Sequence, residues 1–169
     1  MQGLYYPAVL GTGLVLILFR LTMHRTVTAA LGDFALYFGL LFAFFFSISF
    51  LINQDTPNEQ YGLGAFLCDI VEVLLVFGAY FCLGLFNTNQ IVAPDLRSVY
   101  LITAIVIVVQ NGWNYAAGIR LPSLLFLSLL GLAILLSSFF WGYPHLWANI
   151  TTTAILYVLL AFYYRSIAA

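Results

Sequence analysis

Charged side chains are scarce in this sequence of 169 residues: they make up 7% of it, and all five basic residues are arginine. A soluble domain ordinarily carries about a quarter charged residues, which hydrate its surface. Five arginines and six acidic residues cannot cover a water-facing surface of this size. The scarcity also excludes a disordered chain, which is rich in charge, and a nucleic-acid-binding protein, which needs a basic face.

Cysteine and histidine are nearly as rare, which argues against redox and metal sites. Cys68 and Cys82 lie in one apolar run, about 21 Å apart along a helix, which is too far for a disulfide. His24 and His145 both lie in predicted connections between helices, whereas haem ligands project from within a bundle. We therefore predict no cofactor and no metal site.

Familiar catalytic motifs are missing as well. The sequence contains neither H-E-x-x-H nor G-x-S-x-G, the patterns of zinc peptidases and of serine hydrolases. Asp33 and Asp95 are expected near the membrane face opposite to Asp69, so they cannot form an intramembrane pair of catalytic aspartates with it. An enzyme is not favoured, and no catalytic residue is assigned. A lipid-acting enzyme built around His24 and His145 is the weakest of the hypotheses.

Apolar residues, by contrast, are abundant: 64% of the sequence is hydrophobic and 18% is aromatic, with a mean hydropathy of +1.06. A helix that crosses a bilayer needs about 20 apolar residues. Six runs approach this length between short polar connections, which favours helices over barrel strands. The runs are Leu4–Phe19, Phe34–Ile52, Leu63–Phe86, Ser98–Gly118, Pro122–Trp141 and Trp147–Tyr164.

The predicted fold is an all-α, polytopic integral membrane protein: one domain over residues 1–169, with about six transmembrane helices and short loops. The first three residues lack the positive charge that opens a signal peptide, so the first run is expected to stay as a helix. In a six-span chain three arginines fall on one side of the membrane and two on the other. The positive-inside rule then predicts both termini on the non-cytoplasmic side.

Two acidic residues, Asp69 and Glu72, lie inside the third predicted span. They are three residues apart and so share one face of a helix. Counted from Leu63, Asp69 lies about 9 Å deep and Glu72 about 13 Å deep, close to the bilayer midplane. An ionised acid there costs roughly 2.5 to 3.5 kcal/mol on insertion scales. A carboxyl at this depth is therefore expected to be protonated, paired or in contact with a wet cavity.

Three amides of the fourth predicted span lie at matching depths. Because this span runs in the opposite direction, depth is counted back from its end, which puts Asn114 about 6 Å, Asn111 about 10 Å and Gln110 about 12 Å deep. The short connection between the two spans indicates that they are neighbours. Glu72 could then meet Gln110, and Asp69 could meet Asn111 or Asn114.

These residues lead to two hypotheses about function. The first is a small membrane carrier or channel for a proton, a cation or a small amine, which binds at Glu72 with Asp69 and the three amides around it. Asp55 and Glu59, in the connection before the third span, would form a negative vestibule. The alternative is a non-catalytic membrane subunit or accessory protein of a larger complex, whose polar side chains hold helices together.

The expected partners follow from these hypotheses. They are the lipid bilayer, a small cation or proton, and other membrane subunits or a second copy of the chain. No nucleic acid is expected, because the chain has no basic face.

Overall fold

The computed structural model describes residues 2–23, 26–28, 30–31, 62–87, 90, 92–118, 122–141 and 146–168. Over these ranges the regular structure is entirely helical, which confirms the predicted all-α class. The long helices are α1 (Gln2–Met23), α3 (Leu63–Cys82), α4 (Leu96–Ala116), α5 (Pro122–Trp141) and α6 (Leu146–Ala168). The second predicted span, Phe34–Ile52, lies outside the described residues.

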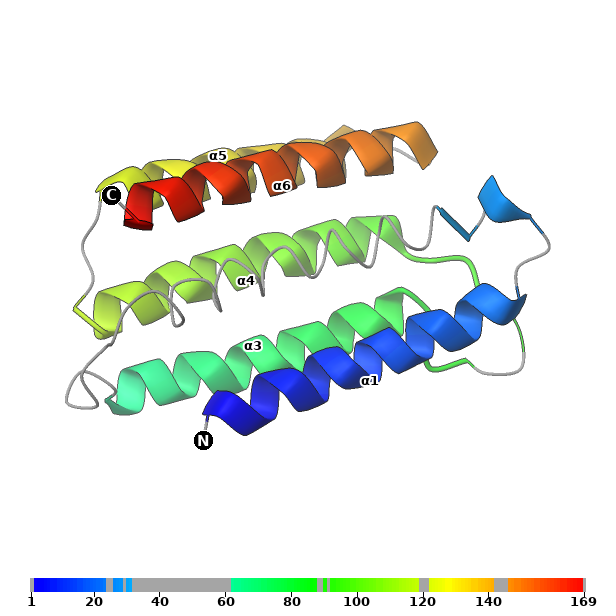
Figure 1. Cartoon of the computed structure of the whole chain (residues 1–169), viewed down its shortest axis with the longest axis horizontal. Coiled ribbons are helices and arrows are strands. Elements are labelled where there is room, and N and C mark those ends of the chain that lie inside the picture. The colour runs from blue at the N-terminus through cyan, green and yellow to red at the C-terminus, as the bar shows by residue number, and fades with distance from the viewer. Residues whose placement is uncertain are drawn as a thin grey trace.

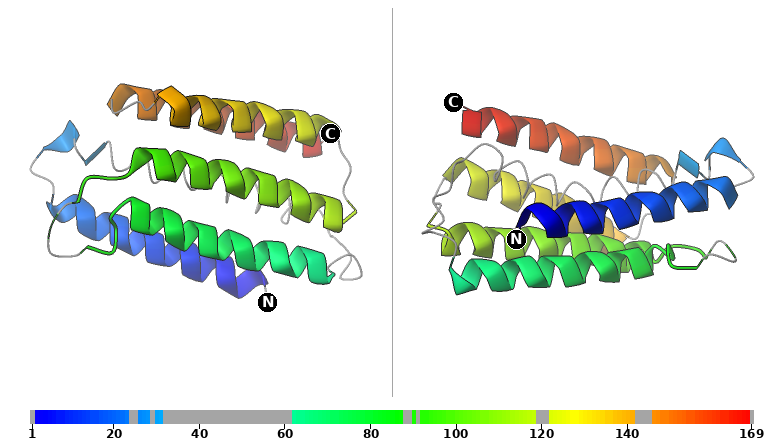
Figure 2. Two further views of the ribbon diagram at one scale, coloured as in Figure 1. Left: turned by 180° about the vertical axis from the view of Figure 1, so that it is seen from behind. Right: turned by 60° about the horizontal axis from the view of Figure 1, so that its bottom comes forward.

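The long helices all run along the length of the molecule (Figure 1), and α6 crosses the direction of α1 at an angle (Figure 2, right). Neighbours pack in the order α1, α3, α4, α5, α6, so the predicted contact between the third and fourth spans is confirmed. α3 and α5 run in one direction, and α4 and α6 in the opposite one, as two views show (Figure 2). α1 runs in the same direction as α3, and both chain termini lie at one end of the bundle, here called the terminal end (Figure 1).

The observed helix boundaries match the predicted spans closely but not everywhere. α5 has the predicted bounds, and α3 begins at the predicted Leu63. α1 and α6 extend beyond their apolar runs at both ends, because a helix continues through polar residues such as Arg20 once its backbone hydrogen bonds are in place. α3, by contrast, ends four residues before the predicted Phe86.

The early end of α3 follows from the glycine at position 84. Gly84 has a φ of +69°, a conformation that favours glycine. Its N–H donates to the carbonyl of Phe81 over 2.9 Å, and the N–H of Leu85 donates to the carbonyl of Tyr80 over 3.0 Å. This pair of bonds is a Schellman motif, and Leu85 and Tyr80 also share one apolar cluster. The helix therefore stops although the sequence stays apolar.

Arg20 of α1 holds the connection between α3 and α4. Arg20 is 5% exposed, and its guanidinium donates to the carbonyl of Leu83 over 2.8 Å and to that of Val92 over 2.7 Å. Leu83 is the C-cap of α3, where a cation is favoured by the helix dipole. A Cβ atom at Gly84 would lie 3.1 Å from this guanidinium. Arg20 thus ties α1 to one end of the α3–α4 pair.

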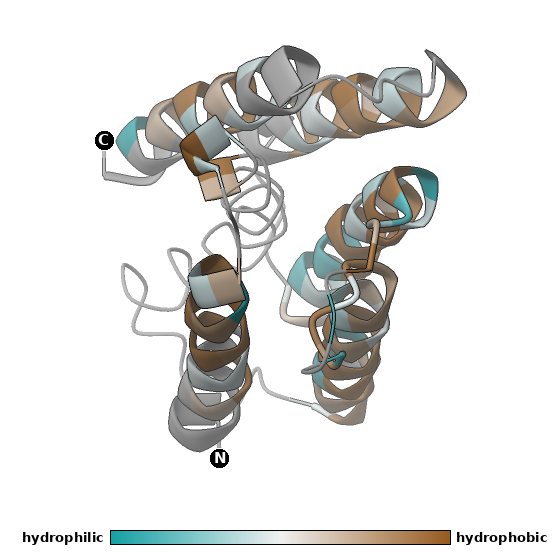
Figure 3. Cartoon of the chain, turned by 90° about the vertical axis from the view of Figure 1, so that its right-hand side faces the viewer, coloured by the Kyte–Doolittle hydropathy of each residue, from teal (hydrophilic) through white to brown (hydrophobic). Residues whose placement is uncertain are grey.

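The exterior of the bundle is apolar and part of its interior is polar. Phe81 is 75% exposed and Phe140 is 72% exposed, and many other large apolar side chains also face outward. Hydrophobic residues dominate the coloured helices in Figure 3. The buried side chains, by contrast, include glutamate, glutamine and asparagine. Apolar side chains outside and polar side chains inside are the reverse of the distribution in a water-soluble bundle, and they suit a lipid environment.

Two of the described helices, α3 and α4, are long and apolar enough to cross a membrane by length and composition. Only 28% of the apolar window in α3 is buried inside the protein. A core helix of a soluble protein would be mostly covered by its own chain. The exposed apolar surface of α3 therefore needs to be covered by lipid or by another protein.

Candidate buried polar site

Small residues fix the register between α3 and α4. A Cβ atom built on Gly64 would lie 3.4 Å from Cβ of Ala116, and equivalent atoms on Gly112 and Gly78 would lie 3.8 Å from the partner helix. In each facing pair the two residue numbers add to 180, as expected for a regular antiparallel pair. The facing pairs are Gly64 with Ala116, Cys68 with Gly112, and Gly78 with Ile102.

Glu72 is buried at the middle of α3. It is the tenth of the twenty residues of this helix and is 1% exposed. It shares the buried side of α3 with Ala65, Val76 and Ala79, which are small or medium-sized. The helix register puts Glu72 and Gln110 within two residues of the same level, about 3 Å along the axis. The carboxyl and the amide thus occupy one layer of the interior.

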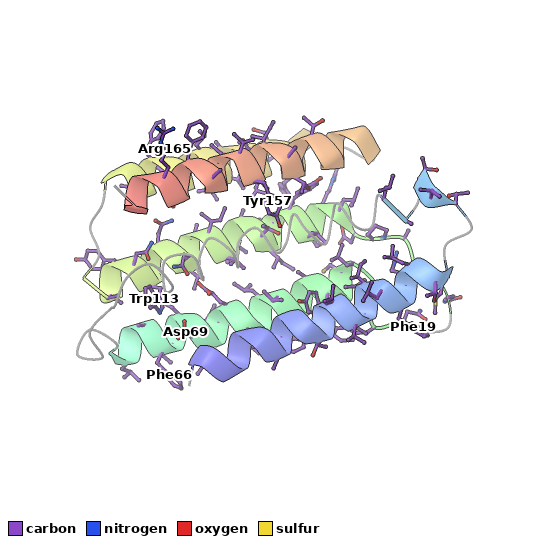
Figure 4. The ribbon with its side chains drawn as sticks, viewed as in Figure 1. Phe19, Phe66, Asp69, Trp113, Tyr157 and Arg165 are labelled. Atoms are coloured by element: carbon purple, nitrogen blue, oxygen red, sulfur yellow. The ribbon has the colours of Figure 1, made fainter. Side chains whose placement is uncertain are left out.

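Asp69 lies at the edge of this layer. Its side chain is partly buried, and the register places it level with Asn111 of α4. Figure 4 shows Asp69 and Trp113 close to the same end of the two helices. Asp69 therefore lies between the Glu72 layer and the terminal end of the bundle.

The three amides of α4 divide into two groups. Gln110 is 2% exposed and Asn114 is 5% exposed, and Nε2 of Gln110 donates to Oδ1 of Asn114 over 3.3 Å. Asn111 is only partly buried and turns back on its own helix, where Nδ2 donates to the carbonyl of Ile107 over 2.8 Å. Of the predicted site residues, Glu72, Gln110 and Asn114 are thus the ones that share the interior.

Several buried hydroxyl groups were not predicted from the sequence. Ser128 of α5 and Thr103 of α4 are buried, and Tyr100 of α4 is hydrogen-bonded to Thr152 of α6. Thr152 lies 3.4 Å from the hydroxyl of Ser138. The signal in the sequence was the spacing of three and four residues along α4, which puts residues 100, 103, 110 and 114 on one side of that helix. The isolated hydroxyls of α5 and α6 carry no such signal.

Other predicted features lie outside the described residues. They are the vestibule residues Asp55 and Glu59 and the two histidines, His24 and His145. Within the described ranges no three His, Cys, Asp or Glu side chains come close enough to hold a metal ion together.

Known proteins resemble the chain only distantly. No family model matches it, and no solved structure matches it. It is similar to N-formyl peptide receptor 2 of human and of gorilla, with 29% identity over 136 residues, which are 71% of this chain and 36% of the receptor. Mouse formyl peptide receptor 2 is 27% identical over 140 residues, 73% of this chain and 37% of that receptor.

The chain thus spans about a third of the length of the receptors it matches. This likeness agrees with the two apolar helices of spanning length and with the apolar exterior. Together they support an all-helical protein in a membrane.

Proposed function

We propose that the chain is a polytopic membrane protein with six spans, whose buried carboxyl Glu72 binds a proton, a cation or a small amine during transport. The six-span arrangement is supported by five long helices in the described ranges. It is also supported by the common direction of α1 and α3 (Figure 1), because one further crossing between them would give that direction. Both termini then lie on one side of the membrane, which the arginine distribution assigns to the non-cytoplasmic side.

A single observation carries the transport hypothesis: Glu72 is 1% exposed at the middle of a helix of spanning length. A buried carboxylate is costly unless it is protonated, paired or hydrogen-bonded. Bundles that need only rigidity can pack apolar residues at such a position at less cost. An acid at this depth therefore points to a role in binding.

The neighbours of Glu72 suit such a role. Gln110 and Asn114 offer carbonyl oxygens to a cation and N–H groups to a carboxylate. When Glu72 is ionised, a cation or a protonated amine is attracted to it, and when it is protonated, that attraction is lost. Competition between a proton and a cation for one carboxyl would then couple their movements.

The likeness to formyl peptide receptors supports membrane helices more than it supports peptide binding. Their name describes receptors for formyl peptides, but the chain matches about a third of each receptor. A peptide site built from the whole receptor would need the remaining two thirds. Binding of a formyl peptide is therefore not part of the proposal.

The test is the substitution Glu72→Gln, which keeps the shape of the side chain and removes its titration. The purified protein is reconstituted in liposomes that contain a pH-sensitive dye, and flux is driven by a pH gradient or by an added amine or alkali cation. We expect the variant to lose the flux that the wild-type protein shows. Asp95→Asn is the matched control, because Asp95 is an exposed acid at the start of α4 and asparagine is an equally good cap.

Equal flux through the wild-type protein and Glu72→Gln would refute the transport hypothesis. The alternative of an accessory subunit predicts a different result: no flux in either protein, and a stable complex with other membrane proteins after mild detergent extraction.

A further inference from the structure

Along the buried side of α4, beside apolar residues such as Ala104 and Trp113, runs a stripe of polar side chains that Ile107 interrupts. Tyr100, Thr103, Ile107, Gln110 and Asn114 are spaced by three or four residues, so they lie along one side of the helix, and all five are buried. From Tyr100 to Asn114 this stripe extends about 21 Å along the axis. It therefore reaches through most of the apolar thickness that α4 could cross.

On the terminal side of Ile107 the stripe forms one polar layer. α5 packs against α4 with Gly131 next to Ile107, and an antiparallel register then puts Ser128 level with Gln110. Nδ2 of Asn114 and Oγ of Ser128 are buried without a hydrogen-bond partner among the described residues. Buried donors in that condition ordinarily bind ordered water. This layer is therefore a place for water inside the bundle.

On the other side of Ile107 lies a second polar layer that joins three helices. The hydroxyl of Tyr100 on α4 is hydrogen-bonded to Thr152 on α6, which lies 3.4 Å from Oγ of Ser138 on α5. All three side chains are buried. Thr103 lies on the same stripe one turn nearer to Ile107. Hydroxyl groups donate and accept at once, so such a chain can pass a proton along.

The two polar layers are separated by an apolar layer. Cδ1 of Ile107 lies 3.5 Å from the place of a Cβ atom on Gly131, and Cδ2 of Leu156 lies 3.9 Å from it. Leu135 belongs to the same apolar cluster. The register of α3 and α4 puts Glu72 within one residue of the level of Ile107. Glu72 thus lies at the boundary between the polar layer that it shares with Gln110 and the apolar layer at Ile107.

We infer that the species carried is the proton, and that Ile107, Gly131 and Leu156 form the apolar barrier that separates a terminal-side path from a path through Tyr100, Thr152 and Ser138. This inference rests on the proposed function of Glu72. A dehydrated metal ion such as Ca²⁺ takes six to eight oxygen ligands. The buried side chains of the layer around Glu72 have fewer: two carboxyl oxygens, the amide oxygens of Gln110 and Asn114, and the hydroxyl of Ser128. Narrow apolar constrictions are known to gate channels by excluding water.

Each transfer in this path is balanced. A hydronium ion in one layer gives a proton to the Glu72 carboxylate, which becomes neutral, and a water molecule is left behind. The same proton leaves to water or a hydroxyl group in the other layer and restores the carboxylate. Each hydroxyl on the way accepts one proton and releases one, so only the position of the charge changes.

The barrier is tested by two substitutions with opposite expected effects. Ile107→Ala removes apolar volume, and we expect proton flux into dye-loaded liposomes to rise several-fold. Gly131→Ala adds a methyl group that fits at ordinary contact distance from Ile107 and Leu156, and we expect it to lower the flux. Ile105→Ala is the matched control, because Ile105 faces outward on the same helix. A flux that neither barrier substitution changes would overturn the inference.

The second layer is tested by Tyr100→Phe, which removes one hydroxyl group. We expect a loss of about tenfold in proton flux, the rate equivalent of one hydrogen bond, with Tyr115→Phe as the control because Tyr115 is exposed. Circular dichroism in detergent reports whether each variant is folded.

The failure of this inference can be told apart from that of the proposed function. If Glu72→Gln abolishes flux but the barrier and Tyr100 variants match the wild-type protein, the path is wrong and the role of Glu72 stands. If the wild-type protein moves no protons but moves an amine or an alkali cation that Glu72→Gln does not, the inference is wrong and the proposed function stands. If the wild-type protein moves none of these, both are wrong.

Discussion

At the scale of single residues, Arg20 and Glu72 are two buried charged side chains with different surroundings. Arg20 contacts two backbone carbonyls and stabilises a connection between helices. Glu72 lies at mid-helix in a layer with Gln110 and Asn114, whose amides offer hydrogen-bond donors and acceptors. A carboxyl accepts hydrogen bonds when ionised and can also donate one when protonated, whereas the guanidinium of Arg20 stays charged and donates in every case.

We predict that Arg20→Ala destabilises the protein by about 3 kcal/mol, because it removes two hydrogen bonds from a charged donor and leaves two carbonyls unsatisfied. The measurement is the midpoint of thermal unfolding in a mild detergent. Arg165→Ala is the control, since Arg165 is exposed in the last turn of α6, and it is expected to change stability by less than about 0.5 kcal/mol. Equal midpoints for the two variants would contradict the role given to Arg20.

At the scale of the helices, the start of α4 is defined by its cap. Asp95 accepts two hydrogen bonds from Ser98, one from its N–H over 3.3 Å and one from the Ser98 hydroxyl over 2.5 Å. These hydrogen bonds from Ser98 hold the pKa of Asp95 below its ordinary value. The cap explains why α4 begins at Leu96, two residues before the predicted apolar run.

We predict that Asp95→Ala lowers stability near neutral pH by about 1 kcal/mol, as loss of an N-cap usually does. The folded pKa lies below the unfolded value, so the contribution of Asp95 is fully present above the unfolded value of about 3.9 and is lost as the pH falls through the folded pKa. Wild-type and Asp95→Ala midpoints should therefore converge in strong acid. Asp95→Asn keeps the cap but does not titrate. The difference between the unfolding midpoints of Asp95→Asn and Asp95→Ala should therefore persist in strong acid.

At the scale of the whole molecule, the distribution of apolar and polar side chains indicates that the surroundings of the bundle are lipid. Large apolar residues cover the outside, while hydroxyl, amide and carboxyl groups lie between the helices in two layers. Because lipid offers no hydrogen bonds, polar groups are better placed against one another than on the surface. The same distribution gives a bundle with a polar interior, which the transport proposal requires.

We predict that the two ends of α3 lie on opposite sides of the membrane. In a protein whose Cys68 and Cys82 are replaced by alanine, single cysteines at Gly62 and Gln90 should react with an impermeant maleimide from opposite sides of sealed vesicles. A cysteine at Arg165 should react from the same side as Gly62, because α6 ends at the end of the bundle where α3 begins (Figure 1). All three positions are exposed. Reaction of all three from one side would rule out the proposed spans.

Much of the helical architecture could be predicted because length and hydropathy act locally. The bounds of α5 and the start of α3 follow from Pro122 and from the apolar run at Leu63. The end of α3 could not be read from hydropathy, because the chain stays apolar through Phe86 and Gly84 turns it. The burial of Arg20 was also not predicted, because its acceptors lie more than sixty residues away in sequence.

The sequence by itself determined the all-helical class. It also singled out Asp69 and Glu72, because charged residues are rare in this chain and these two acids lie inside an apolar run of spanning length. Only the tertiary structure decided which polar residues share the interior. It put Glu72 with Gln110 and Asn114, and turned Asn111 back on its own helix. It also joined Tyr100, Thr152 and Ser138. The reason is that helix register and rotation depend on close contacts such as that between Gly64 and Ala116, which arise only when helices pack.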